Sequence, residues 1–261
     1  MRRLFALSLL CFSASVFAAP VAKPVSWEEG GTNFDGQLVY DDASDAKRPG
    51  LLMVPNWYGV NEHSIEKAKT LAGSDYVILL VDMYGRGLRP ANPQEAGQAA
   101  GAVYADPVAL RARINKALTV LQGSADKAPL DTGNIGGIGF CFGGAMVLEL
   151  ARSGADIKGV ASFHGNLGTR QPATPDSVKA AVLVMNGADD TFVSAEQIAG
   201  FQKEMTDAKA DWQFVNYSGA VHCFAEPDED GSVIGGCKYH EPSYRRSVAL
   251  MRSFFAERFA Q

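Results

Sequence analysis

Gly139-Phe140-Cys141-Phe142-Gly143-Gly144 is the stretch of this 261-residue sequence that decides the fold. It follows a short apolar run at residues 135–138, typical of a buried strand, and leads into helical spacing at residues 144–152. Glycines near Cys141 relieve the crowding of a sharp strand-to-helix turn, because glycine has no Cβ. Such a turn would expose the sulfur at a helix N-terminus, whose partial positive charge favours a thiolate. Taken alone, the stretch fits a glycine-rich turn around an inert buried cysteine equally well.

Short apolar runs alternate with helical spacing along the rest of the chain. Strands are predicted at residues 37–40, 51–54, 76–81, 135–138, 160–163, 180–185 and 212–217, and helices at residues 64–72, 109–121, 144–152, 195–208 and 243–259. This alternation predicts an α/β fold with a mostly parallel sheet and helices on both faces. The remainder of residues 21–47 is polar and turn-rich, and residues 85–106 are expected to form an irregular excursion above the sheet. Residues 19–261 contain no repeat or linker, so we expect a single domain.

The first residues differ in composition from the rest. Arg2 and Arg3 precede an apolar run at residues 4–12, and small residues lead to Ala18. This pattern predicts a secretory signal peptide at residues 1–18, and therefore a protein exported to a bacterial periplasm. An anchored N-terminus is the alternative. A lipoprotein at Cys11 is disfavoured, because the preceding leucine is bulky for lipoprotein processing.

The charge of the chain limits its partners. The formal net charge is −5, and it becomes −7 when cleavage removes two arginines and no acid. An acidic chain without a basic cluster binds nucleic acid poorly and is not attracted to anionic membranes. No stretch after the signal approaches ~18 uninterrupted apolar residues, so no membrane span is predicted. We expect a small molecule as the partner and no cofactor. A monomer is compatible with the sequence, which does not fix the oligomeric state.

Two further strand-end loops carry the residues that a cysteine nucleophile needs. Asp189 and Asp190 follow the strand at residues 180–185, and His222 follows the strand at residues 212–217. Parallel-sheet enzymes bind ligands at the carboxyl ends of their strands. The order nucleophile, acid and histidine is that of the α/β-hydrolase fold. Of the other histidines, His164 also follows a strand, but it precedes the acid in the chain. The order therefore predicts a hydrolase built on Cys141 and His222.

Five segments together resemble the dienelactone hydrolase family: residues 55–61, residues 82–86, the turn at Cys141, residues 187–193 and residues 219–224. The resemblance implies an enzyme that cleaves small ester or lactone bonds. It also implies a catalytic triad of Cys141, His222 and Asp190, with Asp190 rather than Asp189 as the acid. The backbone amides of Trp57 and Phe142 would hold the oxyanion.

Two positions depart from the pattern of the family. Asn56 stands where the family has a glutamate that takes part in activating the thiol. Glu226 stands where the family has its second substrate-binding arginine, whereas Arg86 retains the first. Asn56 and Arg86 are therefore the candidate substrate-binding residues. A glutamate in the place of this arginine should weaken binding of a carboxylated dienelactone. The sequence therefore does not identify the substrate.

Three cysteines remain after signal cleavage: Cys141, Cys223 and Cys237. Their spacing fits no zinc-finger pattern, and we predict no metal site. An odd number in an oxidising compartment leaves at least one thiol unpaired within the chain. A disulfide between Cys223 and Cys237 would hold the loop of His222 in place. Two reduced thiols are the equal alternative.

Two other classes of function compete with the hydrolase. The first is a hydrolase-like binding protein whose triad has drifted, which Asn56 and Glu226 favour. A burst with p-nitrophenyl acetate and a stoichiometric thioester would distinguish the enzyme from it. The second is a thiol redox protein that uses Cys141 with another cysteine. The missing C-x-x-C pair and the presence of the triad order count against it.

Overall fold

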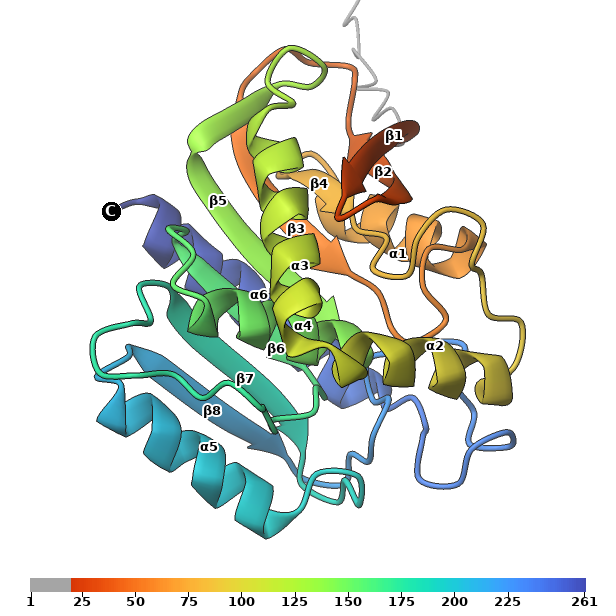
Figure 1. Ribbon diagram of the computed structural model, residues 1–261, viewed down its shortest axis with the longest axis vertical. Coiled ribbons are helices and arrows are strands. Elements are labelled where there is room, and N and C mark those ends of the chain that lie inside the picture. The colour runs from red at the N-terminus through yellow and green to blue at the C-terminus, as the bar shows by residue number, and fades with distance from the viewer. Residues whose placement is uncertain (1–19) are drawn as a thin grey trace, which may run out of the picture.

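The computed structural model describes residues 20–261 (Figure 1), so the signal peptide predicted at residues 1–18 lies outside the described residues. Eight strands form one sheet in the order β1-β2-β4-β3-β5-β6-β7-β8. β1 pairs antiparallel with β2, and β2 pairs antiparallel with β4. All pairs from β4 to β8 are parallel. The predicted α/β fold with a mostly parallel sheet is confirmed.

The elements alternate along the chain, as the sequence indicates. The strands are β1 (Val21–Glu29), β2 (Thr32–Tyr40), β3 (Arg48–Val54), β4 (Val77–Leu80), β5 (Leu130–Phe140), β6 (Gly159–Phe163), β7 (Ala181–Gly187) and β8 (Trp212–Tyr217). The helices are α1 (Glu62–Ala72), α2 (Pro93–Ala105), α3 (Pro107–Gln122), α4 (Phe142–Arg152), α5 (Ala195–Asp207) and α6 (Glu241–Phe259). No helix within residues 20–261 is long and apolar enough to cross a membrane.

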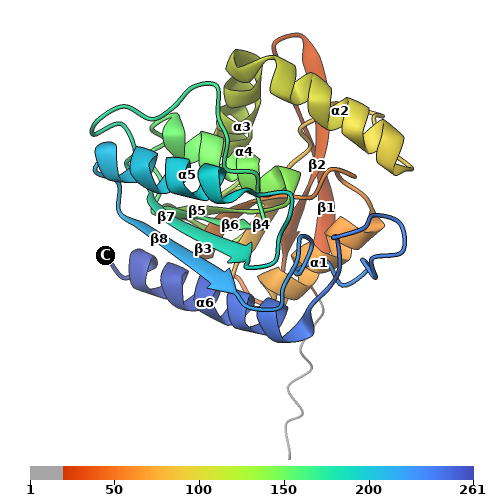
Figure 2. The ribbon, with the colours of Figure 1, turned by 90° about the horizontal axis from the view of Figure 1, so that it is seen from below.

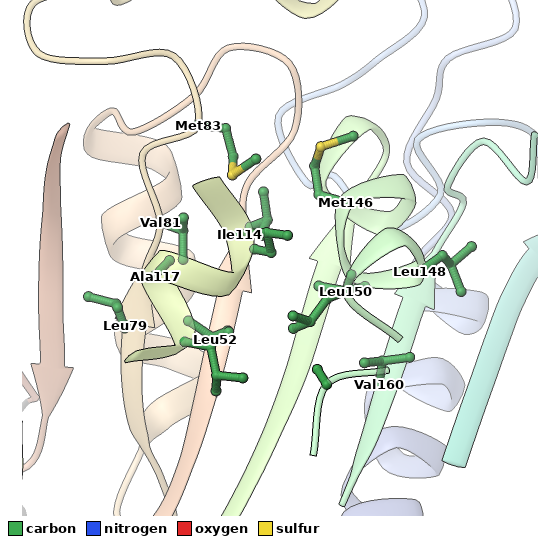
Figure 3. Packing of buried hydrophobic residues seen from close by; sticks show 14 of the residues in the cluster. Leu52, Leu79, Val81, Met83, Ile114, Ala117, Met146, Leu148, Leu150 and Val160 are labelled. Carbon is green, nitrogen blue, oxygen red and sulfur yellow. The ribbon is translucent and has the colours of Figure 1, made fainter. Parts of the chain in front are cut away.

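Helices cover both faces of the sheet (Figure 2). Successive residues of a strand point to opposite faces, so the apolar run of β3 supplies both cores. Leu52 packs in the core beneath α3 and α4, which Figure 3 shows from close by. Leu51 and Met53 pack in the other core, together with residues of α1 and α6. The central strands are therefore buried on both sides, and their carboxyl ends form a rigid edge for the loops that follow.

The expectation of an irregular excursion at residues 85–106 was wrong, because α2 occupies residues 93–105. The side chain of Asn92 accepts a hydrogen bond from the amide of Glu95 and caps the helix. Pro93 occupies the first turn, where the missing N–H costs no helical hydrogen bond. Proline usually suggests the end of a helix, but here Pro93 starts one.

The strand β1 was also missing from the predicted set. Residues 21–29 lie in the segment predicted to be polar and turn-rich, but they form the edge strand of the sheet. Gly30 and Gly31 both have positive φ and connect β1 to β2 as a two-residue hairpin turn. Trp27 stacks on Phe34 across the hairpin, with ring centroids 5.9 Å apart. A cross-strand aromatic pair thus stabilises a strand whose own composition is polar.

Candidate active site

Cys141 lies at the strained turn between β5 and α4. Its backbone has φ 53° and ψ −115°, in a region that residues other than glycine rarely adopt. A Cβ at position 139 would lie 2.0 Å from the carbonyl oxygen of Gly143. A Cβ at position 143 would lie 2.0 Å from the carbonyl oxygen of Val54. Both glycines are therefore required for the backbone to approach so closely, as the sequence predicts.

Cys141, His222 and Asp190 form a chain of contacts. The Nε2 atom of His222 lies 3.2 Å from the sulfur of Cys141. At the other side of the ring, Nδ1 of His222 lies 2.8 Å from Oδ2 of Asp190. The second carboxylate oxygen of Asp190 accepts a hydrogen bond of 2.8 Å from the amide of Phe192, which fixes its orientation. The neighbouring Asp189 is exposed and makes no such contact with the ring.

The surroundings of His222 favour its protonated form. Burial opposes the charge on the imidazole, but the hydrogen bonds with Asp190 and Cys141 outweigh it and raise the pKa of His222 to about 10. The Asp190 side chain is fully buried, and the His222 side chain is 12% exposed. The protonated ring of His222 therefore donates from Nδ1 to the buried carboxylate and from Nε2 to the sulfur. This arrangement places a protonated imidazole in contact with the sulfur of Cys141.

The sulfur of Cys141 faces a mainly apolar cavity of about 260 Å³. Of the described residues that line the cavity, none is an aspartate, glutamate, lysine or arginine. They are Trp57, Ala100, Tyr104, Cys141, Phe142, Asn166, Phe192, Val193, His222, Cys223, Ile234 and Cys237. The cavity therefore suits a small, uncharged molecule.

The two residues expected to supply oxyanion donors both line this cavity. Phe142 is the first residue of α4, so its N–H has no acceptor within the helix. The backbone of Trp57 is fixed from behind, because the hydroxyl of Tyr84 donates a hydrogen bond of 2.8 Å to its carbonyl oxygen. Burial raises the pKa of Tyr84, so this hydroxyl stays protonated. Both backbone segments are thus held at the cavity wall.

The candidate substrate-binding residues lie outside the lining of the cavity at Cys141. Arg86 forms a two-point ion pair with Asp35, with N–O distances of 2.7 and 3.0 Å, and its side chain is 56% exposed. Asn56 accepts a hydrogen bond of 3.1 Å from the amide of Tyr58 and lines a separate cavity. Glu226 lines that same separate cavity and is ion-paired with Lys67. The negative charge of Glu226 is therefore compensated within the protein.

Cys223 and Cys237 form a disulfide, which settles the alternative that the sequence leaves open. The bridge holds two segments of the chain together beside His222. The carbonyl oxygen of His222 accepts a hydrogen bond of 2.9 Å from the amide of Lys238. Cys141 is the free cysteine within residues 20–261. The disulfide thus pins the loop of the imidazole and leaves one thiol for chemistry.

Sequence reasoning missed the buried polar groups behind His222. His164 follows β6 and is completely buried, with its ring centroid 5.1 Å from that of His222. Burial, aided by His222 and Lys67, holds the pKa of His164 well below its usual value. Lys67 lies over the ring of Phe140, 4.4 Å from its centroid, and pairs with Glu226. The position of His164 directly after a strand of the parallel sheet is the signal in the sequence, but the order nucleophile, acid and histidine does not select it.

A strained cysteine at a strand-to-helix turn, in contact with an imidazole from another strand-end loop of a parallel sheet, is typical of the α/β-hydrolase class. The model of the dienelactone hydrolase family matches residues 34–259, and the chain belongs to this family. The resemblance predicted from the sequence is therefore confirmed. Membership makes the protein a carboxylic ester hydrolase.

Similar proteins agree with this assignment. A probable 2-oxo-3-(5-oxofuran-2-ylidene)propanoate lactonase from Bradyrhizobium sp is 28% identical over 218 residues, which cover 79% of this chain and 86% of the relative. The solved structure of a protein named m3DLH has a TM-score of 0.84 and 33% identity, and covers 93% of this chain and 100% of its own. A dienelactone hydrolase-like promiscuous phosphotriesterase from metagenomic libraries has a TM-score of 0.83 and 31% identity, with the same coverage.

Proposed function

We propose that the protein hydrolyses small, uncharged esters or lactones through a triad of Cys141, His222 and Asp190. The observation that carries the proposal is the contact chain from the sulfur through the imidazole to the buried carboxylate, at 3.2 and 2.8 Å. A nucleophile, a base and a group that orients the base are the parts of a triad. The sulfur also faces the cavity of about 260 Å³, where a substrate carbonyl would sit.

In the acylation step, the thiolate of Cys141 attacks the carbonyl carbon of the substrate. The electron pair of the carbonyl moves to the oxygen, which accepts hydrogen bonds from the amides of Trp57 and Phe142. One donor of this kind lowers a barrier by about 3 kcal/mol. The carbonyl then re-forms and the bond from the carbon to the ester oxygen breaks. The departing alkoxide takes the proton from Nε2 of His222. The products are a thioester on Cys141 and a free alcohol, or a tethered alcohol from a lactone.

In the deacylation step, the neutral His222 accepts a proton from a water molecule that attacks the thioester. The carbon–sulfur bond then breaks, the sulfur leaves as a thiolate, and the acyl group is released as a carboxylic acid. His222 is left protonated, as before acylation. Asp190 keeps its contact with Nδ1 throughout, so it fixes the tautomer and stabilises the charged ring. The raised pKa of His222 favours the return to the resting pair.

The lining of the cavity supports an uncharged substrate rather than a carboxylated dienelactone. A substrate carboxylate would lose its water of hydration against aromatic and aliphatic side chains, and the one cationic ring of the lining, His222, is already in contact with Asp190 and Cys141. Arg86, which the resemblance offers as a clamp, is instead paired with Asp35. We therefore propose that selection is made by size and by the absence of charge.

A matched pair of substrates tests this proposal. p-Nitrophenyl butyrate and mono-p-nitrophenyl succinate differ in having a methyl group or a carboxylate at the end of the acyl chain. We expect kcat/KM to be higher for butyrate by at least about tenfold, because the carboxylate is desolvated and the only cationic ring of the lining, His222, is already engaged by Asp190 and Cys141. Equal values, or a preference for succinate, would contradict the proposed substrate class.

Variants of the triad test the mechanism. Cys141→Ala and His222→Ala should each abolish turnover, and the wild-type chain should gain the mass of the acyl group on Cys141 during turnover. Retention of wild-type turnover by Cys141→Ala would remove the foundation of the proposal. A wild-type chain that binds these esters without a burst or a thioester would instead be the drifted binding protein.

We also propose that the protein is exported to an oxidising compartment, the periplasm of a bacterium. The predicted signal peptide and the disulfide between Cys223 and Cys237 support this location, because disulfides persist where thiols are not kept reduced. Fractionation of cells that express the full chain tests it. A full-length chain in the cytosolic fraction, with residues 1–18 retained, would contradict export.

A further inference from the structure

Three side chains of different strand-end loops meet beneath the cavity: Cys141 after β5, His164 after β6, and His222 after β8. One possible ligand atom from each residue lies within 4.8 Å of those of the other two. The sulfur and Nε2 of His222 are already 3.2 Å apart. The ring of His164 packs edge-on against that of His222. A thiol and two imidazoles therefore surround one point.

His164 has no partner that accounts for its place there. Its side chain is completely buried, and neither ring nitrogen has a hydrogen-bond partner among residues 20–261. Oε1 of Glu226 lies 3.9 Å from Nε2 of His164, beyond hydrogen-bond distance. A buried polar group without a hydrogen-bond partner destabilises the fold. The backbone of His164 also has φ 40°, which is rare for a residue with a Cβ. An imidazole held under these conditions is available as a ligand.

We propose that Cys141, His164 and His222 bind a zinc ion, which reversibly inhibits the hydrolase. Thiolate and imidazole are the ligands that Zn²⁺ prefers, at bond lengths of about 2.3 Å to sulfur and about 2.0 Å to nitrogen. In a tetrahedral site these bonds place the donor atoms roughly 3.3–3.6 Å apart. The sulfur of Cys141 and Nε2 of His222 nearly meet this spacing, whereas the separations that involve His164, of up to 4.8 Å, must shorten when the ion binds.

The surroundings of the three ligands fit a zinc site. Asp190 already binds Nδ1 of His222, the arrangement in which a carboxylate orients a histidine ligand and increases its basicity. Three protein ligands leave a fourth position of the ion, which the cavity at Cys141 can supply with water. The ion would replace the contact between sulfur and imidazole on which hydrolysis depends. Zinc binding and turnover therefore exclude each other.

Direct binding measurements test the site without depending on hydrolysis. The oxidised protein, in buffer free of thiols and chelators, competes with a chromogenic indicator for Zn²⁺. We expect one ion per wild-type chain. His164→Gln should weaken binding by at least about 100-fold, more than the 10–100-fold that loss of an outer partner costs. Substitution with Co²⁺ should give a thiolate-to-cobalt charge-transfer band in the near ultraviolet, which Cys141→Ser removes.

His63→Gln is the matched control, because this imidazole is exposed and pairs with Asp228 at the surface. We expect it to bind Zn²⁺ as the wild type does. Loss of binding in His63→Gln but not in His164→Gln would assign the ion to the surface and overturn the proposal. Absence of the cobalt band in the folded wild-type protein would also overturn it, whatever the fate of the variants.

The inhibition is measured separately on the wild-type enzyme. Turnover of p-nitrophenyl butyrate should fall with the midpoint of the direct titration and return when EDTA is added. A protein that hydrolyses the ester but binds no stoichiometric zinc would contradict the zinc site alone. A protein that binds zinc as predicted but forms no thioester would contradict the proposed function alone.

Discussion

Replacing Asp190 by asparagine tests whether the buried carboxylate holds the proton on His222. The pKa of His222 lies at about 10 instead of 6.5, which corresponds to about 5 kcal/mol of preference for the protonated ring. Burial opposes this preference, and the hydrogen bond with Asp190 is the largest contribution in its favour. Asparagine keeps the shape of the side chain but removes the charge. The pKa of His222 should therefore fall when asparagine replaces Asp190.

The lower pKa of His222 should change the alkaline part of the pH profile of kcat/KM. The proposed mechanism needs the protonated ring of His222, so kcat/KM should decline near pH 10 in the wild type and at a lower pH in Asp190→Asn. Lost transition-state stabilisation of about 3 kcal/mol should also lower kcat/KM by about 100-fold at neutral pH. The turnover of phenyl acetate, measured as a function of pH, gives both the alkaline limb and the loss in kcat/KM. The rate at which iodoacetamide alkylates Cys141 reports the reactivity of the sulfur separately.

The exposed neighbour Asp189 supplies the control, because Asp189→Asn removes the same charge one residue away. We expect its pH profile to match that of the wild type. An alkaline limb that does not move in Asp190→Asn would refute the reasoning. So would an equal displacement in both variants, because the effect would then arise from net charge rather than from contact with the ring.

Three further changes test the packing around the site. The first two are measured by urea unfolding, and the third by solubility and activity. Lys67→Met leaves the buried Glu226 unpaired and should destabilise the fold by about 3–5 kcal/mol, whereas the double variant with Glu226→Leu should recover most of the loss. No recovery would show that packing, not charge, is decisive. Replacing both Cys223 and Cys237 by serine should cost about 3 kcal/mol for a separation of 14 residues; unchanged stability would contradict this. Gly143→Ala should prevent folding, because its Cβ would lie 2.0 Å from a backbone oxygen of β3, and a soluble, active variant would contradict the close approach.

The central part of the fold could be predicted because burial on both faces leaves a clear pattern. Strands such as β3 and β7 are continuous apolar runs, and the helices between them have apolar residues three and four apart. The two missed elements lack this pattern. The polar strand β1 depends on its hairpin partner, and α2 depends on a cap and a proline whose effect changes with position.

The sequence predicts the part of the candidate site that depends on local pattern and chain order, and not the part that depends on contacts between distant residues. Chain order and strand ends brought Cys141, Asp190 and His222 to one edge of the sheet, and these three residues are in contact. The disulfide could not be decided, because sequence separation does not reveal the distance between two loops. The compensation of Glu226 by Lys67 depends on a contact between residues 159 positions apart, which no local pattern reveals.

Topology selects the loops, but the local backbone selects the side chain that each loop directs to the site. In the loop after β7, Asp190 rather than Asp189 reaches the imidazole, because its carboxylate also accepts the amide of Phe192. In the loop after β6, a left-handed backbone places His164 behind the ring of His222 instead of at the surface. Chain order does not distinguish Asp189 from Asp190, or predict where His164 points, because all three residues follow parallel strands. The same sheet edge therefore supports both the proposed hydrolytic triad and a ligand set that can silence it, and the sequence order predicts only the first.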